Sequence, residues 1–298
     1  MDVYEYGDPS ANALLIQPVD DHDLALLERE TAAIREGTSA GFRLLAVRVG
    51  SWNADLSPWD APPVFGKEGF GHGAAETLRE VEELCRDAPG ERFIGGYSLA
   101  GLFALWAAHQ TDLFSGVAAA SPSVWFPGFT EFMRTHPIRT GAVYLSLGDR
   151  EDRTRNPVMA TVKNRILEAR DRIEEQGADC ALEWNRGNHF MDPDRRTARA
   201  FAWLLDRRRT CRTRACPGQG KAGIPMRYKR GNCLMAVPSL VTVGSYSASA
   251  FTVSAAMRPE TMISVKALPP RRLPPWIPPV TSPAAYRPGM ISPSVFST

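Results

Sequence analysis

Apolar runs alternate with segments of helical periodicity throughout residues 1–209. The runs predict buried strands at 11–19, 42–49, 92–97, 115–125, 142–148 and 181–184. Between them, apolar side chains recur every three or four residues, which predicts helices around 24–34, 78–85, 99–109, 158–173 and 193–208. Buried strands separated by helices are typical of the α/β class, with a mostly parallel sheet and helices on both faces.

This pattern stops near Thr210. Of the 298 residues, the segment 211–298 contains 11 Lys and Arg but one acidic residue, Glu260, and it holds 13 of the 24 prolines. Such a proline density is incompatible with a compact sheet or bundle, although 234–253 could form a strand or two. We therefore expect a catalytic domain at 1–209 and a basic, Pro-rich, disordered tail at 210–298. The tail lacks the interleaved aromatics and lysine clusters of a nucleic-acid-binding segment.

Composition indicates the compartment. The sequence has no apolar stretch of membrane-spanning length, and its acidic N-terminus is unlike a signal peptide. Five widely spread cysteines argue against a disulfide framework, and Cys211 and Cys216 lack further ligands at zinc spacing. We expect a cytoplasmic protein with no membrane or nucleic-acid partner, no metal and no cofactor.

A sharp turn between a buried strand and an apolar helix carries the strongest candidate for chemistry. Gly96, Ser98 and Ala100 form a Gly-x-Ser-x-Gly pattern in which alanine replaces the last glycine. A serine on such a strained turn crowds the backbone two positions away on either side, so those positions must be small. The following helix would direct free N–H groups toward the serine. The placement predicts a nucleophile elbow with Ser98 as the nucleophile.

A serine nucleophile needs a base, and the sequence offers five histidines. His189 follows the last predicted strand, at the carboxyl edge where parallel sheets bind their ligands. The other four have weaker positions: His109 ends the helix of the nucleophile, His136 precedes a proline, His22 opens the first helix, and His72 lies on a long aromatic loop where it could line a pocket. We therefore predict His189 as the general base.

A carboxylate should fix the imidazole tautomer and stabilise its charged form. The loop after the strand at 142–148 offers three, namely Asp149, Glu151 and Asp152. Glu151 has room to turn back toward His189, whereas Asp149 could cap the turn and Asp152 is expected to pair with neighbouring arginines. We favour Glu151 and keep Asp149 as the alternative.

An oxyanion hole needs backbone N–H donors. Leu99, directly after the nucleophile, is one by position. The other should come from the loop after the first strand, where Pro18 has no N–H, so the donor is Val19 or Asp20.

Several motifs together resemble one known family. The segments GYSLAGLFALWA, SPSVWFPGF, SLGDREDRTRNPVM and GNHF, within about residues 10–206, are similar to the esterase branch of the α/β-hydrolase superfamily. That branch includes feruloyl esterases, S-formylglutathione hydrolase and enterobactin-type esterases. The resemblance implies an α/β-hydrolase fold, and about 210 residues show no obvious large cap domain. It carries over Ser98 as nucleophile, His189 as base, and Glu151 or Asp149 as acid, and the order serine, acid, histidine fits that fold.

Four aromatic residues lie on loops at the predicted carboxyl edge of the sheet: Trp52, Trp59, Trp125 and Phe126. There they suit an aryl or acyl group, although loop packing would use the same residue types. The expected activity is hydrolysis of a small or moderate-sized ester through an acyl-enzyme on Ser98. Two alternatives stay open: an acyltransferase using the same acyl-enzyme, and a catalytically inactive binding protein with this fold.

Overall fold

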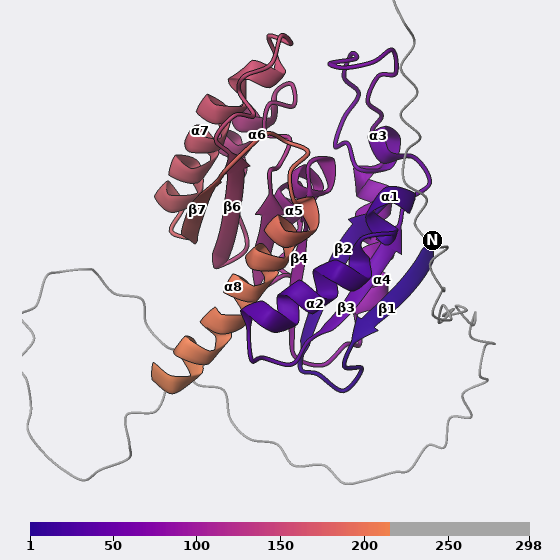
Figure 1. Ribbon diagram of the computed structural model, residues 1–298, viewed down its shortest axis with the longest axis vertical. Helices are drawn as coiled ribbons and strands as arrows, with labels where there is room; N and C mark the ends of the chain where they lie inside the picture. The colour runs from indigo at the N-terminus through magenta and orange to yellow at the C-terminus, as the bar shows by residue number, and fades with distance from the viewer. Residues whose placement is uncertain (215–298) are drawn as a thin grey trace, which may run out of the picture. The chain divides into compact units, whose positions relative to one another are not determined.

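The computed structural model describes residues 1–214, which form one sheet with helices on both faces (Figure 1). The strands are β1 (Asp2–Gly7), β2 (Ala13–Val19), β3 (Arg43–Arg48), β4 (Glu91–Tyr97), β5 (Gly116–Ala120), β6 (Ala142–Gly148) and β7 (Asp179–Asn185). Their order across the sheet is β1-β3-β2-β4-β5-β6-β7. β1 is antiparallel to β3, and all the other neighbouring pairs are parallel. The predicted α/β class and mostly parallel sheet are confirmed.

The helices separate into two layers. They are α1 (Asp21–Leu24), α2 (Leu27–Gly37), α3 (Trp52–Asp55), α4 (Ala74–Cys85), α5 (Leu99–Gln110), α6 (Phe129–Thr135), α7 (Val162–Glu175) and α8 (Pro193–Arg214), with a short 3₁₀ helix, Met159–Thr161, before α7. α2 and α8 pack against each other over one face of the sheet (Figure 1). Residues of α4, α5, α6 and α7 belong to the core on the other face. Within residues 1–214 there is no large cap domain.

Burial explains why the central elements form. Every residue of β2 and of β5 is buried, because helices cover both faces of the sheet there. α5 is buried from Leu99 to His109, so its apolar character continues around the whole helix. The turn before α5 is therefore held on one side by a central strand and on the other by a core helix.

Three elements differ from the sequence prediction. β1 was not expected: its DVYEYG sequence buries Val3 alone, as an edge strand with few apolar residues does. The strand predicted at 115–125 ends at Ala120, because Ser121 has a positive φ of 42° and starts a turn before Pro122. The first predicted helix is divided into α1 and α2.

The predicted boundary near Thr210 falls inside α8, which continues to Arg214. The rest of the predicted tail lies outside the described residues. Of the helices in residues 1–214, none combines the length and the apolar character needed to cross a membrane.

Candidate active site

Ser98 lies on the turn between β4 and α5 with φ 55° and ψ −116°, a conformation that residues other than glycine rarely adopt. A Cβ added to Gly96 would lie 2.6 Å from the Cβ of Ala100, so the turn requires glycine at this position. The N–H of Ser98 donates to the carbonyl oxygen of Ala120 at 3.1 Å, which ties the turn to β5. The structure therefore has the sharp turn that the sequence predicts.

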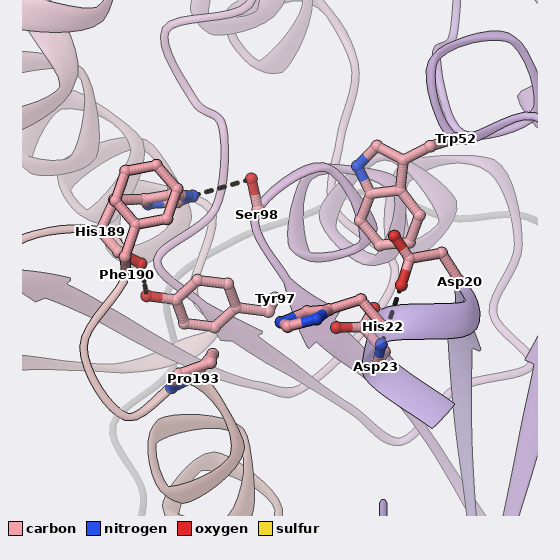
Figure 2. A pocket seen from close by; sticks show the side chains of 9 residues that line it. All are labelled: Asp20, His22, Asp23, Trp52, Tyr97, Ser98, His189, Phe190 and Pro193. Atoms are coloured by element: carbon pink, nitrogen blue, oxygen red, sulfur yellow. Dashed lines mark hydrogen bonds between the residues drawn. The ribbon is translucent and has the colours of Figure 1, made fainter. Parts of the chain in front are cut away.

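His189 reaches Ser98 from the loop between β7 and α8. Its Nε2 lies 3.0 Å from Ser98 Oγ, and Figure 2 shows the two side chains pointing at each other. Its Nδ1 lies 2.7 Å from Glu151 Oε2. We assign the proton to Nδ1, because that tautomer donates to the carboxylate and leaves Nε2 to accept from the serine hydroxyl.

Glu151 is buried, with 3% of its side chain exposed. Its Oε1 accepts hydrogen bonds from the Gly148 N–H at 2.6 Å and from Ser121 Oγ at 2.8 Å. Burial by itself raises the pKa of Glu151, but the hydrogen bond and charge of His189, with the Gly148 N–H and the Ser121 hydroxyl, outweigh it and hold the pKa below its usual value. The group is thus a carboxylate at neutral pH.

The other two acidic residues of this loop have different positions. Asp149 Oδ1 accepts from the Gly187 N–H at 2.8 Å, and the Asp149 N–H donates to the Asn185 carbonyl at 2.7 Å. Asp149 thus ties the loop after β6 to the loop after β7. Among residues 1–214, the carboxylate that is hydrogen-bonded to His189 belongs to Glu151 and not to Asp149 or Asp152.

Arg196, on α8, was not singled out from the sequence. Its side chain is 1% exposed, and Nη1 donates to Glu151 Oε1 at 2.8 Å. The guanidinium also donates to Tyr97 Oη, to Ser121 Oγ and to the carbonyl oxygens of Arg186 and Asn188. A signal existed: Arg196 lies one helical turn before the apolar residue Ala200, on the side of the helix that is buried.

Tyr97 directly precedes Ser98 and holds the loop that carries His189. Its hydroxyl donates to the carbonyl oxygen of His189 at 2.7 Å and accepts from Arg196 at 3.1 Å. Burial, followed by the charge of Glu151, raises the pKa of Tyr97 to about 12. The hydroxyl therefore keeps its proton at neutral pH and remains a donor.

The expected oxyanion donors belong to two elements, α5 and the end of β2. Leu99 is the first residue of α5, where N–H groups have no partner within the helix. Val19 is the last residue of β2 and is fully buried, whereas Asp20 caps α1 and lines the pocket next to Ser98.

A pocket of about 460 Å³ opens at Ser98 (Figure 2). Its lining consists of Asp20, His22, Asp23, Trp52, Tyr97, Ser98, His189, Phe190 and Pro193. His189 and Phe190 lie on one side of Ser98, and Asp20, His22, Asp23 and Trp52 on the other (Figure 2). Ser98 thus lies between two walls of the pocket that differ in composition.

Of the four aromatic residues predicted to bind substrate, Trp52 lines this pocket and the other three do not. Trp59 donates from Nε1 to the carbonyl oxygen of Pro127 at 2.9 Å and packs edge-on against Phe126. Trp125 and Phe126 are buried against Phe70. The contacts of these three residues are those of loop packing, because their side chains lie against rings and a carbonyl oxygen of neighbouring loops.

Two of the remaining histidines differ from the expectation that His72, and not His22, could line the pocket. His72 is exposed and pairs with Asp60 at 2.9 Å outside the pocket, whereas His22 is in the lining. Within residues 1–214, His, Cys, Asp and Glu side chains form no group of three that could hold a metal ion.

Comparison with solved structures supports the fold. An IroE-like serine hydrolase from Shewanella oneidensis superimposes with a TM-score of 0.55 at 14% sequence identity, over 68% of this chain and 75% of that chain. The enterobactin esterase of Shigella flexneri gives a TM-score of 0.48 at 14% identity, over 70% of this chain and 55% of that chain. No family model matches the sequence, and no curated protein matches it. The sheet order, the strained serine turn and the similarity to the Shewanella hydrolase identify the fold of this chain as that of the α/β-hydrolases.

Proposed function

We propose that the protein is a serine ester hydrolase of the carboxylesterase type, acting on a small-molecule ester through an acyl-enzyme on Ser98. The observation that supports it best is the continuous chain of hydrogen bonds from Ser98 Oγ through His189 to Glu151, with distances of 3.0 Å and 2.7 Å. Nucleophile, base and orienting carboxylate are thus within the range of a working triad.

The first half of the reaction forms the acyl-enzyme. His189 Nε2 takes the hydroxyl proton while Ser98 Oγ attacks the ester carbonyl carbon. The resulting oxyanion lies against backbone N–H groups, those of Leu99 and of Val19 or Asp20. When the tetrahedral intermediate collapses, the carbon–oxygen bond to the alcohol breaks, and His189 gives its proton to the departing alkoxide.

The second half regenerates the enzyme. His189 takes a proton from a water molecule, which attacks the acyl carbon, and the proton returns to Ser98 Oγ as the acid leaves. In both halves the imidazole is transiently charged beside Glu151, whose second oxygen is bonded to Arg196. The ion pair keeps the carboxylate in one orientation, so Oε2 stays directed at His189.

The assignment is tested with Ser98→Ala, assayed on p-nitrophenyl acetate and butyrate. We expect kcat/KM to fall by at least about a thousandfold, because no other nucleophile occupies the turn. Ser115→Ala is the matched control, because Ser115 is an exposed serine that precedes β5. Fluorophosphonate labelling should mark the wild type and Ser115→Ala but not Ser98→Ala. Equal turnover by Ser98→Ala would contradict the role of Ser98. A wild type that neither labels nor hydrolyses these esters would favour an inactive binding protein.

A further inference from the structure

One wall of the pocket carries two carboxylates, and the basic side chain beside them is the imidazole of His22, whose charge acts on Asp23. Asp20 and Asp23 both line it, and no Lys or Arg is part of the lining. Asp20 Oδ1 accepts the N–H of Asp23 at 2.8 Å, which fixes the first carboxylate at the start of α1. The nearby Arg29 and Arg48 are paired with other acids, Asp194 and Asp21.

An aromatic ring completes this wall. Trp52 lines the same pocket, and Figure 2 shows it with Asp20 on the side of Ser98 away from His189. The face of an indole attracts cations, and carboxylates next to it add charge attraction. Residues 1–210 carry 32 Asp and Glu against 24 Lys and Arg, so the domain around the pocket is also net acidic. The combination is suited to an ammonium group and unsuited to an anion.

The position of the base decides which half of an ester meets this wall. His189 must reach the departing oxygen, so the alcohol half lies on its side, toward Phe190 and Pro193. The acyl half then extends past Ser98 toward Trp52 and α1. We propose that the pocket selects esters whose acyl group carries a cationic ammonium group, bound by Asp20, Asp23 and Trp52. This specificity rests on the proposed esterase function.

The experiment compares p-nitrophenyl esters that share one leaving group. The cationic substrate is the ester of γ-trimethylammonio-butyrate, and the matched substrate has a tert-butyl group in place of trimethylammonium. An anionic substrate is the p-nitrophenyl monoester of glutarate. We expect kcat/KM for the cationic ester to exceed that of the tert-butyl isostere by on the order of tenfold, with the glutarate ester the poorest of the three.

Variants of Asp20 and Asp23 test whether these two carboxylates cause the preference for the cationic ester. Asp23→Asn and Asp20→Asn should each lower the ratio of cationic to tert-butyl ester at least twofold, and the double variant should bring it near one. Asparagine is also a good N-cap, so α1 is retained in Asp20→Asn. Glu28→Gln, on the exposed side of α2, should leave the ratio unchanged. The ratio is measured within one preparation, so a partly unfolded sample does not change it.

Each other outcome overturns a defined statement. Equal turnover of the cationic ester and its isostere overturns the inference alone, since the esterase is then active. A preference that survives in the double variant overturns the role of the two carboxylates. If acetylcholine is preferred over its tert-butyl isostere, 3,3-dimethylbutyl acetate, while the two p-nitrophenyl esters are hydrolysed equally, the proposed orientation of the ester is wrong. If no ester is hydrolysed and fluorophosphonate does not label Ser98, the proposed function is wrong and the specificity with it.

Discussion

The Ser98 turn and the His189 loop meet at one site but are held in different ways. The turn is short and local: a central strand enters it, a buried helix leaves it, and Gly96 and Ala100 touch across it. The loop of His189 is fixed by side chains of other elements. Glu151 is hydrogen-bonded to the ring, Tyr97 donates to the His189 carbonyl oxygen, and Arg196 donates to the Asn188 carbonyl oxygen.

This difference indicates where the site is vulnerable. The strained conformation of Ser98 is imposed by two elements of the core, so it should persist as long as the domain is folded. The imidazole keeps its place through a small buried network around one ion pair. Removing a single member of that network should affect the base while the turn of the nucleophile stays in place.

The largest expected effect is on kcat/KM, and it distinguishes the two candidate acids, Glu151 and Asp149. Glu151→Gln removes the charge beside His189, and we expect kcat/KM on p-nitrophenyl butyrate to fall about 10²–10⁴-fold. Asp149→Asn keeps an oxygen for the Gly187 N–H, and its kcat/KM should stay within about twofold of wild type. Both are assayed at a temperature where circular dichroism shows them folded. A larger loss in Asp149→Asn than in Glu151→Gln would reverse the assignment of the acid.

The next effect is on stability. Arg196→Met leaves the Glu151 carboxylate buried without its cation, and the free energy of unfolding should decrease by about 3–5 kcal/mol. Arg195→Met is the control at the adjacent, exposed position and should change little. Both are measured by urea denaturation.

Hydrogen exchange in the same pair tests the comparison directly. In Arg196→Met the amides of 186–192 should exchange faster than in the wild type, and by a larger factor than those of 96–102. Equal acceleration in both segments would show that the turn and the loop are one cooperative unit.

The smallest effect is a pH dependence of selectivity. Burial, and then the charge of Asp20, raises the pKa of Asp23 to about 6. The carboxyl is neutral below that pH and charged above it, so the preference for the cationic ester over its tert-butyl isostere should increase severalfold between about pH 5 and 7. Both esters depend on the protonation of His189 in the same way, so this dependence cancels in the ratio of their kcat/KM values.

Asp23→Asn is the control for this profile. The other titratable groups near this wall are Asp20 at the N-cap of α1, His22 on α1, Glu30 on α2 and His189 opposite. These groups are retained in Asp23→Asn, so any pH dependence of the ester ratio that remains in this variant comes from them and not from Asp23. A wild-type profile that matches the Asp23→Asn profile would show that Asp23 does not face the substrate.

Much of the fold was accessible from the sequence because its signals are local. Continuous apolar runs indicate strands covered on both faces, and β2, β4, β5 and β6 appear where those runs lie. β1 was missed for the complementary reason: an edge strand needs few apolar residues, so DVYEYG has no clear pattern. The turn after Ala120 was missed because Ser121 adopts a positive φ without a glycine.

At the site, the sequence placed Ser98 and His189 at the carboxyl edge of a parallel sheet, and the structure brings their side chains together. It favoured Glu151 but kept Asp149 as an alternative, since two carboxylates two positions apart both follow β6. The choice depends on how the loops after β6 and β7 cross, with the Gly187 N–H engaging one acid and His189 the other.

What the sequence by itself determined is the set of features encoded in neighbouring residues: the alternation of strands and helices, the small residues around a strained serine, and a histidine after the last strand. What only the tertiary structure decided is which distant side chains share a location. Arg196 beside Glu151, Trp52 in the pocket, and Trp59 away from it all depend on packing between segments far apart in the chain. The physical reason is that periodicity reports whether a side chain is buried, whereas its partner is set by how separate elements come together.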